Sequence, residues 1–171
     1  MKVLSILLLS FSIFYAKIIN LDSYSSEFTQ TITNTANTKI IYNGNLYINN
    51  NKNILWRYTN PIRKDVYINQ LKVMIVEPEL EQVITSQINE ELDLFNILNS
   101  STKIDENTYT NSVNGIEYTI FLKNKILQNI KYTDEIDNNV NIAFTNTSNE
   151  IELDDSLFTF NIPNHYDIIR K

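Results

Sequence analysis

The sequence predicts a mainly β protein with short helices, built as an open (incomplete) antiparallel β-barrel with a helical lid. Strand-length apolar and aromatic runs recur along most of the chain, separated by short polar connections, which is typical of an antiparallel meander. Two other stretches carry apolar residues at helical spacing. A single sheet of roughly ten strands curls because strand twist accumulates, and two apolar helices can cover the concave face that results.

Size and composition indicate one domain that does not bind nucleic acid. The 171 residues suffice for a sizeable core. The formal net charge is −6, whereas phosphate binding requires a basic face. The chain has no cysteine, which excludes a thiol nucleophile and a cysteine-based metal site. Glycine occurs only twice, and 26 asparagines are available for turns, because asparagine tolerates left-handed backbone conformations.

The first residues have the pattern of a secretory signal peptide. Lys2 precedes the uncharged run from Val3 to Tyr15, and Ala16 is the candidate last residue before cleavage. The run is shorter than the ~20 apolar residues that a membrane-spanning helix needs. We therefore expect residues 1–16 to be a signal peptide and 17–171 to form the mature domain. The alternatives are an uncleaved anchor and a buried first strand.

The stretch from Leu21 to Asn34 predicts the first lid helix. Leu21, Tyr24, Phe28 and Ile32 recur at three- and four-residue spacing, which would place them on one stripe of a helix. Threonines in this stretch lower its helix propensity. We therefore expect the helix to depend on packing against the sheet.

The segment from Gly44 to Val83 organises the predicted sheet. Ile54, the only tryptophan Trp56, and Tyr58 alternate along one strand, so they share a face. Leu46 and Ile48 provide apolar side chains on the preceding strand, and Gly44 is expected to mark a bulge or bend. Such a face suits either a dry core or an apolar ligand.

The second lid helix is predicted over Asn89 to Leu98, where Leu92 and Phe95 belong to a broad apolar side. Strands then resume, and Asn114-Gly115 is the strongest hairpin signal in the chain. The predicted strands of this half cover residues 109–113, 116–123, 126–133 and 140–145.

Catalytic and metal-binding patterns are sparse. His165 is the only histidine, and it lies in the tail without a serine-nucleophile motif near it. The acidic groups at Glu77 to Glu81 and at Asp154-Asp155 are more typical of solvated turns than of a metal site. Two glycines cannot build a phosphate-binding loop. We therefore assign no catalytic residue, no metal and no cofactor.

The order and spacing of these motifs resemble the LolA family of outer-membrane lipoprotein carriers. The family has a strand opened by glycine, followed by an apolar-x-Trp-x-Tyr strand that ends near proline. The matching residues in this chain are Gly44, Leu46, Ile48, Ile54, Trp56, Tyr58 and Pro61. The family also has a Pro-x-apolar-Glu-Gln-Val turn, matched here by Pro78, Leu80, Glu81, Gln82 and Val83. Its C-terminal Phe-x-Phe-x-x-Pro segment is matched by Phe158, Phe160 and Pro163. The resemblance covers essentially the whole mature chain.

This resemblance implies a periplasmic shuttle, expected to be a monomer. It would take acylated lipoproteins from an inner-membrane lipoprotein-releasing ABC transporter to an outer-membrane receptor. The acyl chains would lie in an apolar cavity under the lid. We expect the cavity to be lined by Leu46, Ile48, Ile54, Trp56 and Tyr58, and the lid helices to contribute Leu21, Tyr24, Phe28, Leu92 and Phe95.

One departure from the family pattern concerns the lid. Asn50 and Asn51 stand where the family has an Arg-Pro pair whose arginine holds the lid by hydrogen bonds, and Lys52 is close by. The alternatives to the carrier function are another half-barrel that binds apolar ligands, an enzyme on the same fold, and a secreted structural β-sandwich. The related outer-membrane receptor would need a lipidated cysteine, which the chain lacks.

Overall fold

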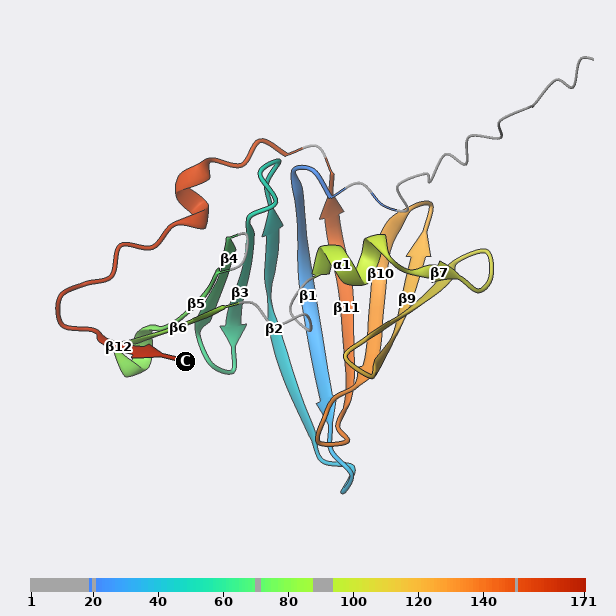
Figure 1. The fold of residues 1–171 in the computed structure, drawn as a ribbon, viewed down its shortest axis with the longest axis horizontal. Helices are drawn as coiled ribbons and strands as arrows, with labels where there is room; N and C mark the ends of the chain where they lie inside the picture. Colours follow the sequence, from blue (N-terminus) through green and yellow to red (C-terminus); the bar gives the residue numbers. More distant parts are fainter. Residues whose placement is uncertain (1–18, 20, 70–71, 88–93, 150) are drawn as a thin grey trace, which may run out of the picture.

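The fold is a single curved sheet, seen in a computed structural model that describes residues 19, 21–69, 72–87, 94–149 and 151–171. Its strand order is β12-β6-β5-β4-β3-β2-β1-β11-β10-β9-β8-β7 (Figure 1). Neighbouring strands are antiparallel except for the parallel pair of β12 and β6. The strands are β1 Tyr24–Thr33, β2 Lys39–Ile48, β3 Ile54–Asn60, β4 Lys64–Asn69, β5 Lys72–Glu77, β6 Gln82–Gln87, β7 Thr102–Lys103, β8 Thr108–Val113, β9 Ile116–Lys123, β10 Ile126–Thr133, β11 Asn139–Ser148 and β12 Asp167–Arg170.

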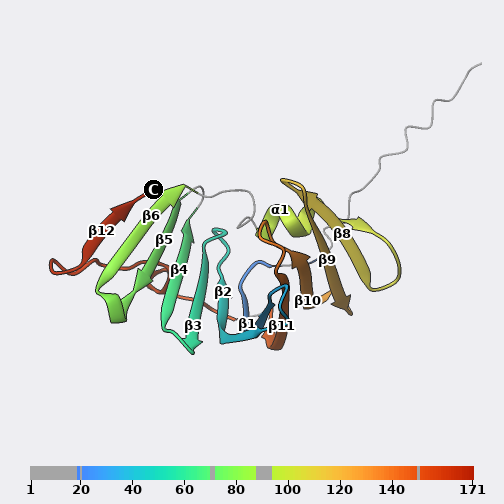
Figure 2. The same cartoon turned by 90° about the horizontal axis from the view of Figure 1, so that it is seen from below.

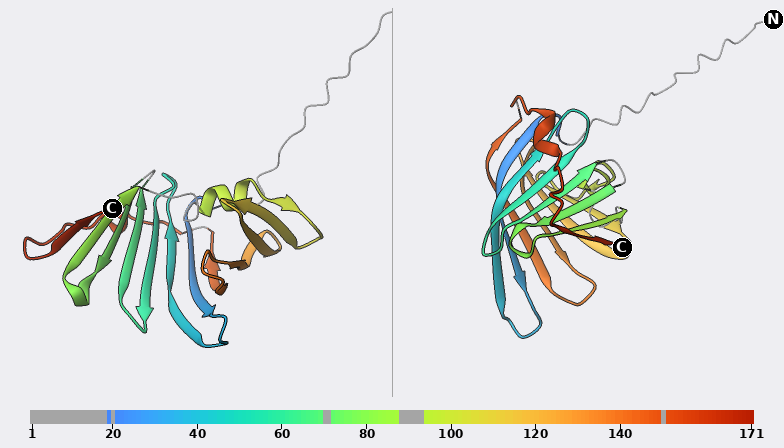
Figure 3. Two further views of the ribbon diagram at one scale, coloured as in Figure 1. Left: turned by 60° about the horizontal axis from the view of Figure 1, so that its bottom comes forward. Right: turned by 90° about the vertical axis from the view of Figure 1, so that its left-hand side faces the viewer.

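The sheet bends into an open barrel that does not close. Viewed from below, the strands follow an arc, with helix α1 (Leu94–Asn99) on its inner side (Figure 2). The short strands β12 and β7 form the two edges, which lie at opposite ends of the sheet in the left view of Figure 3. The predicted fold class is therefore confirmed. None of the helices in the described residues is long and apolar enough to cross a membrane.

Asparagine begins the tight turns that connect β8, β9 and β10. Asn114 and Gly115 connect β8 to β9 with φ values of 51° and 82°, and Asn124 and Lys125 connect β9 to β10 with 52° and 61°. Two successive left-handed residues match the twist of the flanking strands. The hairpin predicted at Asn114-Gly115 is confirmed, as is the break between the predicted strands 116–123 and 126–133.

The first predicted lid helix is wrong. Tyr24 and Phe28 lie on β1, which occupies the middle of the sheet between β2 and β11. Leu21 lies just before this strand and is buried in the core. Residues four apart face the same way in a strand as well as in a helix. The threonines at 29, 31 and 33 favour the strand, because β-branched side chains fit a pleated surface.

The second predicted lid helix is present in part. Helix α1 covers six residues, with Leu94, Ile97 and Leu98 buried. Phe95 is half-buried and packs against the same core. The predicted start of this helix at Asn89, and Leu92 with it, lie outside the described residues.

Each face of the sheet has its own core. The concave face holds the larger cluster, which includes Phe28, Leu46 and Leu94. On the convex face, the C-terminal segment 151–166 packs Phe158 and its neighbours against β3 to β6. This second cluster consists of Leu55, Tyr67, Val76, Val83 and Phe158, with Tyr47, Met74, Leu153, Leu157, Phe160, Ile162 and Tyr166 partly buried around it.

Candidate functional site

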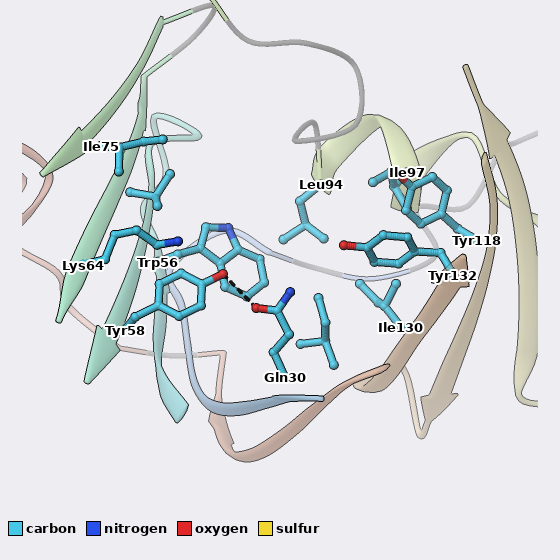
Figure 4. Close-up of a pocket in the computed structure, with 12 residues that line it drawn as sticks. Gln30, Trp56, Tyr58, Lys64, Ile75, Leu94, Ile97, Tyr118, Ile130 and Tyr132 are labelled. Carbon is cyan, nitrogen blue, oxygen red and sulfur yellow. Dashed lines mark hydrogen bonds between the residues drawn. The ribbon is translucent and has the colours of Figure 1, made fainter. Parts of the chain in front are cut away.

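A cavity of about 210 Å³ lies on the concave face, between the two walls of the curved sheet and beneath α1 (Figure 4). Its volume is below the roughly 300–1,000 Å³ of typical ligand pockets, so a long ligand requires the walls or the helix to move. Most of its lining is apolar or aromatic. The lining residues are Gln30, Trp56, Tyr58, Lys64, Val66, Ile75, Leu94, Ile97, Tyr118, Ile130, Tyr132 and Ile142.

The strand register explains why one wall is apolar. Trp56 pairs with Val66, and Val66 pairs with Ile75, so these three side chains form a row across β3, β4 and β5. Paired residues point to the same face of a sheet. The next row, Leu55 with Tyr67, faces the opposite side and belongs to the convex core.

An aromatic cluster supports this wall from the middle of the sheet. The ring of Phe28 lies edge-on to Trp56, with centroids 5.1 Å apart, and edge-on to Tyr58 at 5.0 Å. The Trp56 ring also lies near that of Phe144 on β11, with centroids 6.1 Å apart. Such edge-to-face pairs are favourable beyond their buried area. The cluster therefore fixes Trp56 and Tyr58 at the cavity.

The cavity contains a few polar groups. The Tyr58 hydroxyl donates a hydrogen bond of 3.1 Å to Oε1 of Gln30. Burial, with a smaller contribution from nearby Tyr42, raises the pKa of Tyr58 to about 12. Lys64 Nζ lies 4.5 Å from the centre of the Tyr58 ring, and desolvation lowers its pKa although Glu77 acts in the opposite direction.

Helix α1 covers the cavity and is fastened at its end. Leu94 and Ile97 point into the cavity. The Asn111 side chain on β8 donates to the main-chain oxygens of Asn96 (3.2 Å) and Ile97 (3.1 Å). These carbonyls lie in the last turn of the helix, and that of Asn96 also accepts a hydrogen bond of 3.1 Å from the main-chain N–H of Ser100. An amide from the sheet thus connects β8 to the last turn of α1.

The structure divides the five predicted cavity residues into two groups. Trp56 and Tyr58 line the cavity. Leu46, Ile48 and Ile54 lie on the same face in the packed core, at most 1% exposed, and are not among the lining residues. Whether acyl chains contact any of the five stays a prediction.

Most of the remaining lining residues were not predicted. Tyr118, Ile130, Tyr132 and Ile142 come from β9, β10 and β11. Every second residue of β9 from Ile116 to Leu122 is buried. This alternation could have shown which side chains of the strand face the interior. Nothing in the sequence distinguished Lys64 from an ordinary surface lysine.

The asparagine-rich turn between β2 and β3 is built around Asn49. Its Oδ1 accepts hydrogen bonds from the main-chain N–H groups of Asn51 and Asn53, and its Nδ2 donates to Asp155 at 2.7 Å. Lys52 reaches the lid, because its Nζ lies 5.8 Å from the centre of the Phe95 ring. Lys52 therefore contacts α1 through a cation–π interaction at the outer limit of its range.

His165 lies away from the cavity. It is exposed, and its ring contacts Tyr166 with centroids 5.0 Å apart. In the part of the chain that the structure describes, no group of three His, Cys, Asp or Glu residues is arranged to hold a metal ion.

Comparison with known proteins identifies the family. The model of the family "Outer membrane lipoprotein carrier protein LolA" matches residues 20–120. An outer-membrane lipoprotein carrier protein from Campylobacter jejuni is 34% identical over 156 residues, which are 91% of this chain and 91% of that protein. This chain belongs to the LolA family.

A second relative has a similar sequence, and two solved structures share the fold. The outer-membrane lipoprotein carrier protein of Wolinella succinogenes is 31% identical over 153 residues, 89% of each chain. A LolA superfamily protein from Nitrosomonas europaea has a similar fold, with a TM-score of 0.52, 10% identity, and coverage of 85% of this chain and 94% of that one. An uncharacterized conserved protein from Thermus thermophilus gives a TM-score of 0.56 at 11% identity, covering 88% and 91%.

Proposed function

We propose that this protein carries lipoproteins by holding their acyl chains in the cavity under α1. The observation that carries the proposal is a mainly apolar cavity, closed by a short helix, in a member of the LolA family. Burying a CH₂ group is worth about 0.8 kcal/mol. An acyl chain in water is therefore driven strongly into such a site.

A carrier must also release its cargo, and the lid suits that task. In the described residues helix α1 covers six positions, far fewer than the ~12–15 that an isolated helix needs, so it is held by its packing and by the Asn111 hydrogen bonds. A cover of this size can open at a small free-energy cost. Apolar contacts lack fixed directions, so a chain can leave without breaking a set of strong hydrogen bonds.

The proposed route of the cargo is supported by membership of the LolA family. We propose that residues 1–16 direct export, that residues 17–171 act as a monomer in the periplasm, and that the protein is not an enzyme. It would receive acylated lipoproteins from an inner-membrane ABC transporter and deliver them to an outer-membrane receptor.

The direct test is a release assay. The chain from residue 17 is incubated with inner membranes that contain acyl-labelled lipoproteins, the transporter and ATP. We expect a soluble one-to-one complex on a sizing column. If the labelled lipoprotein stays in the membrane while the transporter hydrolyses ATP, the carrier function is refuted.

The position of the cargo can be tested with the single tryptophan. Because Trp56 lines the cavity, an acyl chain brominated along its length should quench its fluorescence. Ile97→Glu places a charge in the cavity and should abolish quenching. Ile136→Glu is the matched control, because Ile136 is 76% exposed. Equal quenching in both variants would place the chain elsewhere.

A further inference from the structure

Lys64 brings a cation to the cavity, and its position is unusual. Lys64 begins β4 and pairs with Tyr58 of β3. Its side chain is half-buried and points into the cavity across the Tyr58 ring, with Nζ 4.5 Å from the ring centre (Figure 4). The ammonium group therefore lies against the volume that the cargo would occupy, beside Gln30 and the Tyr58 hydroxyl.

The carboxylate expected to pair with Lys64 is engaged elsewhere. Glu77 ends β5, the strand next to β4, and its negative charge acts to raise the pKa of Lys64. However, Oε2 of Glu77 accepts a hydrogen bond from the Gln82 side chain. Among the described residues, Lys64 has no carboxylate within ion-pair distance and no hydrogen-bond acceptor.

A partly buried ammonium without an acceptor is an incomplete site. An ammonium has three donors, and the ring face below it supplies attraction without accepting hydrogen bonds in the ordinary way. Removing a charge from water is costly unless a counter-charge or acceptor replaces the water. The chain as a whole is acidic, with a net charge of −6, so a general excess of basic residues does not explain a lysine in this cavity.

We propose that the cavity selects amphiphiles with an anionic head, a carboxylate or a phosphate, and that Lys64 binds this head while the chain lies against Trp56 and α1. This inference rests on the proposed function, because both use the same cavity. The neighbouring Gln30 amide and Tyr58 hydroxyl provide further hydrogen-bonding groups for head-group oxygens. The desolvation that lowers the pKa of Lys64 is relieved by such a ligand.

The test compares ligands that differ only in their head. Binding of decanoate, decyl phosphate, 1-decanol and decyltrimethylammonium to the mature chain is measured by isothermal titration calorimetry. Acetate and inorganic phosphate test whether the head alone suffices. We expect both anions to bind about tenfold more tightly than decanol, a ratio that corresponds to 1.4 kcal/mol. The cation should bind most weakly, and acetate and phosphate alone should not bind measurably.

Substitutions assign the preference to Lys64. Lys64→Met keeps an unbranched side chain and should reduce the ratio of decanoate to decanol affinity to about one. Lys64→Arg should restore it. Lys131→Met is the matched control, since Lys131 also lies over an aromatic ring, 5.1 Å from Phe121, yet is exposed on the opposite face.

The outcomes separate the two proposals. If decanol and decanoate bind equally to the unmodified protein, the head-group inference is refuted while the acyl cavity stands. If neither binds, the proposed function itself fails. An unchanged anion preference in Lys64→Met, or an equal loss in Lys131→Met, would assign the preference to another part of the molecule and overturn the role of Lys64.

Discussion

Phe28 on β1 lies directly opposite Gly44 on β2, and the Phe28 ring occupies the space that a side chain at Gly44 would need. A Cβ atom built on Gly44 would be 2.8 Å from two carbons of that ring. The register between β2 and β3 shifts at the same glycine. An aromatic ring placed over a strand glycine packs its exposed backbone. This arrangement lets Phe28 reach across β2 to Trp56 and Tyr58 on β3.

Gly44→Ala should be among the most damaging single-methyl additions. The new Cβ would also lie 2.1 Å from the main-chain oxygen of Arg57, and a backbone atom cannot rotate away. We expect a loss of about 3 kcal/mol, the upper end of typical overpacking costs, measured by urea unfolding. Trp56 fluorescence should change as well, because Phe28 supports that ring.

The control for this substitution is the other glycine. Gly115 has a φ of +82°, and no atom lies within 4 Å of the place that a Cβ would take there. Gly115→Asn should therefore cost only a few tenths of a kcal/mol up to about 1 kcal/mol, because asparagine tolerates left-handed backbone. If Gly44→Ala costs no more than Gly115→Asn, the packing of Phe28 over Gly44 does not matter for stability.

Asn49 connects the β2–β3 turn to the C-terminal segment, and its amide orientation can be tested. Asn49→Asp keeps an acceptor for the N–H groups of Asn51 and Asn53 but places a carboxylate against Asp155. We expect a loss of about 1–3 kcal/mol at neutral pH. Part of this loss should disappear on acidification, because a proton shared between two adjacent carboxylates removes their repulsion.

A double variant checks the interpretation. Asn49→Asp combined with Asp155→Asn recreates an amide–carboxylate hydrogen bond with the partners exchanged. Its urea midpoint should exceed that of Asn49→Asp alone, which a double-mutant cycle would report as a favourable coupling. No recovery would mean that the contact between Asn49 and Asp155 contributes nothing to the attachment of the segment.

Tyr58 should lose its proton later than an ordinary tyrosine. Burial raises its pKa from 10.0 to about 12, so the folded state retains a proton that the unfolded chain releases. The stability contribution is complete below pH 10 and declines as the pH rises to about 12. Subtracting the 295-nm titration of Tyr58→Phe from that of the unmodified protein should reveal a late ionisation. A difference curve centred near 10 would contradict the buried environment.

Asn111→Ala should loosen the lid. The substitution removes both side-chain hydrogen bonds to the carbonyls of Asn96 and Ile97. At roughly 1 kcal/mol for each bond, the two bonds are worth about 2 kcal/mol. We therefore expect a bound acyl probe to dissociate about thirtyfold faster in a stopped-flow displacement measurement. Ser112→Ala, at an exposed position on the same strand, is the control. Equal dissociation rates in the two variants would exclude Asn111 as the fastening of α1.

Local signals were sufficient for most strands of this fold. Asn114-Gly115 and Asn124-Lys125 fix two-residue turns through their own backbone preferences, so the hairpins around them could be predicted. The stretch from Tyr24 to Ile32 could not be decided by spacing, because a four-residue interval fits both periods. Its threonines were the better guide, and the central position of β1 shows that tertiary packing determines this segment.

The cavity was harder to predict, because it depends on which strands face each other. Trp56 and Tyr58 could be placed on the inner face from their alternation, whereas Tyr132 and Ile142 reach the same cavity from strands far along the chain. The pairing of β12 with β6 could not be predicted from local sequence either, because parallel strands are not joined by a tight turn that the sequence would reveal.

The central position of β1 also affects the order in which the sheet can form during synthesis. One side of β1 pairs with β2, the next strand to be made, but its other side pairs with β11, where Phe28 meets Phe144. Until β11 has emerged, the middle strand has an open row of N–H and C=O groups and the phenylalanine at its centre is uncovered. The newly made N-terminal half is thus an aggregation-prone half-sheet, and a holding factor that covers that edge would protect the chain until its last third has emerged.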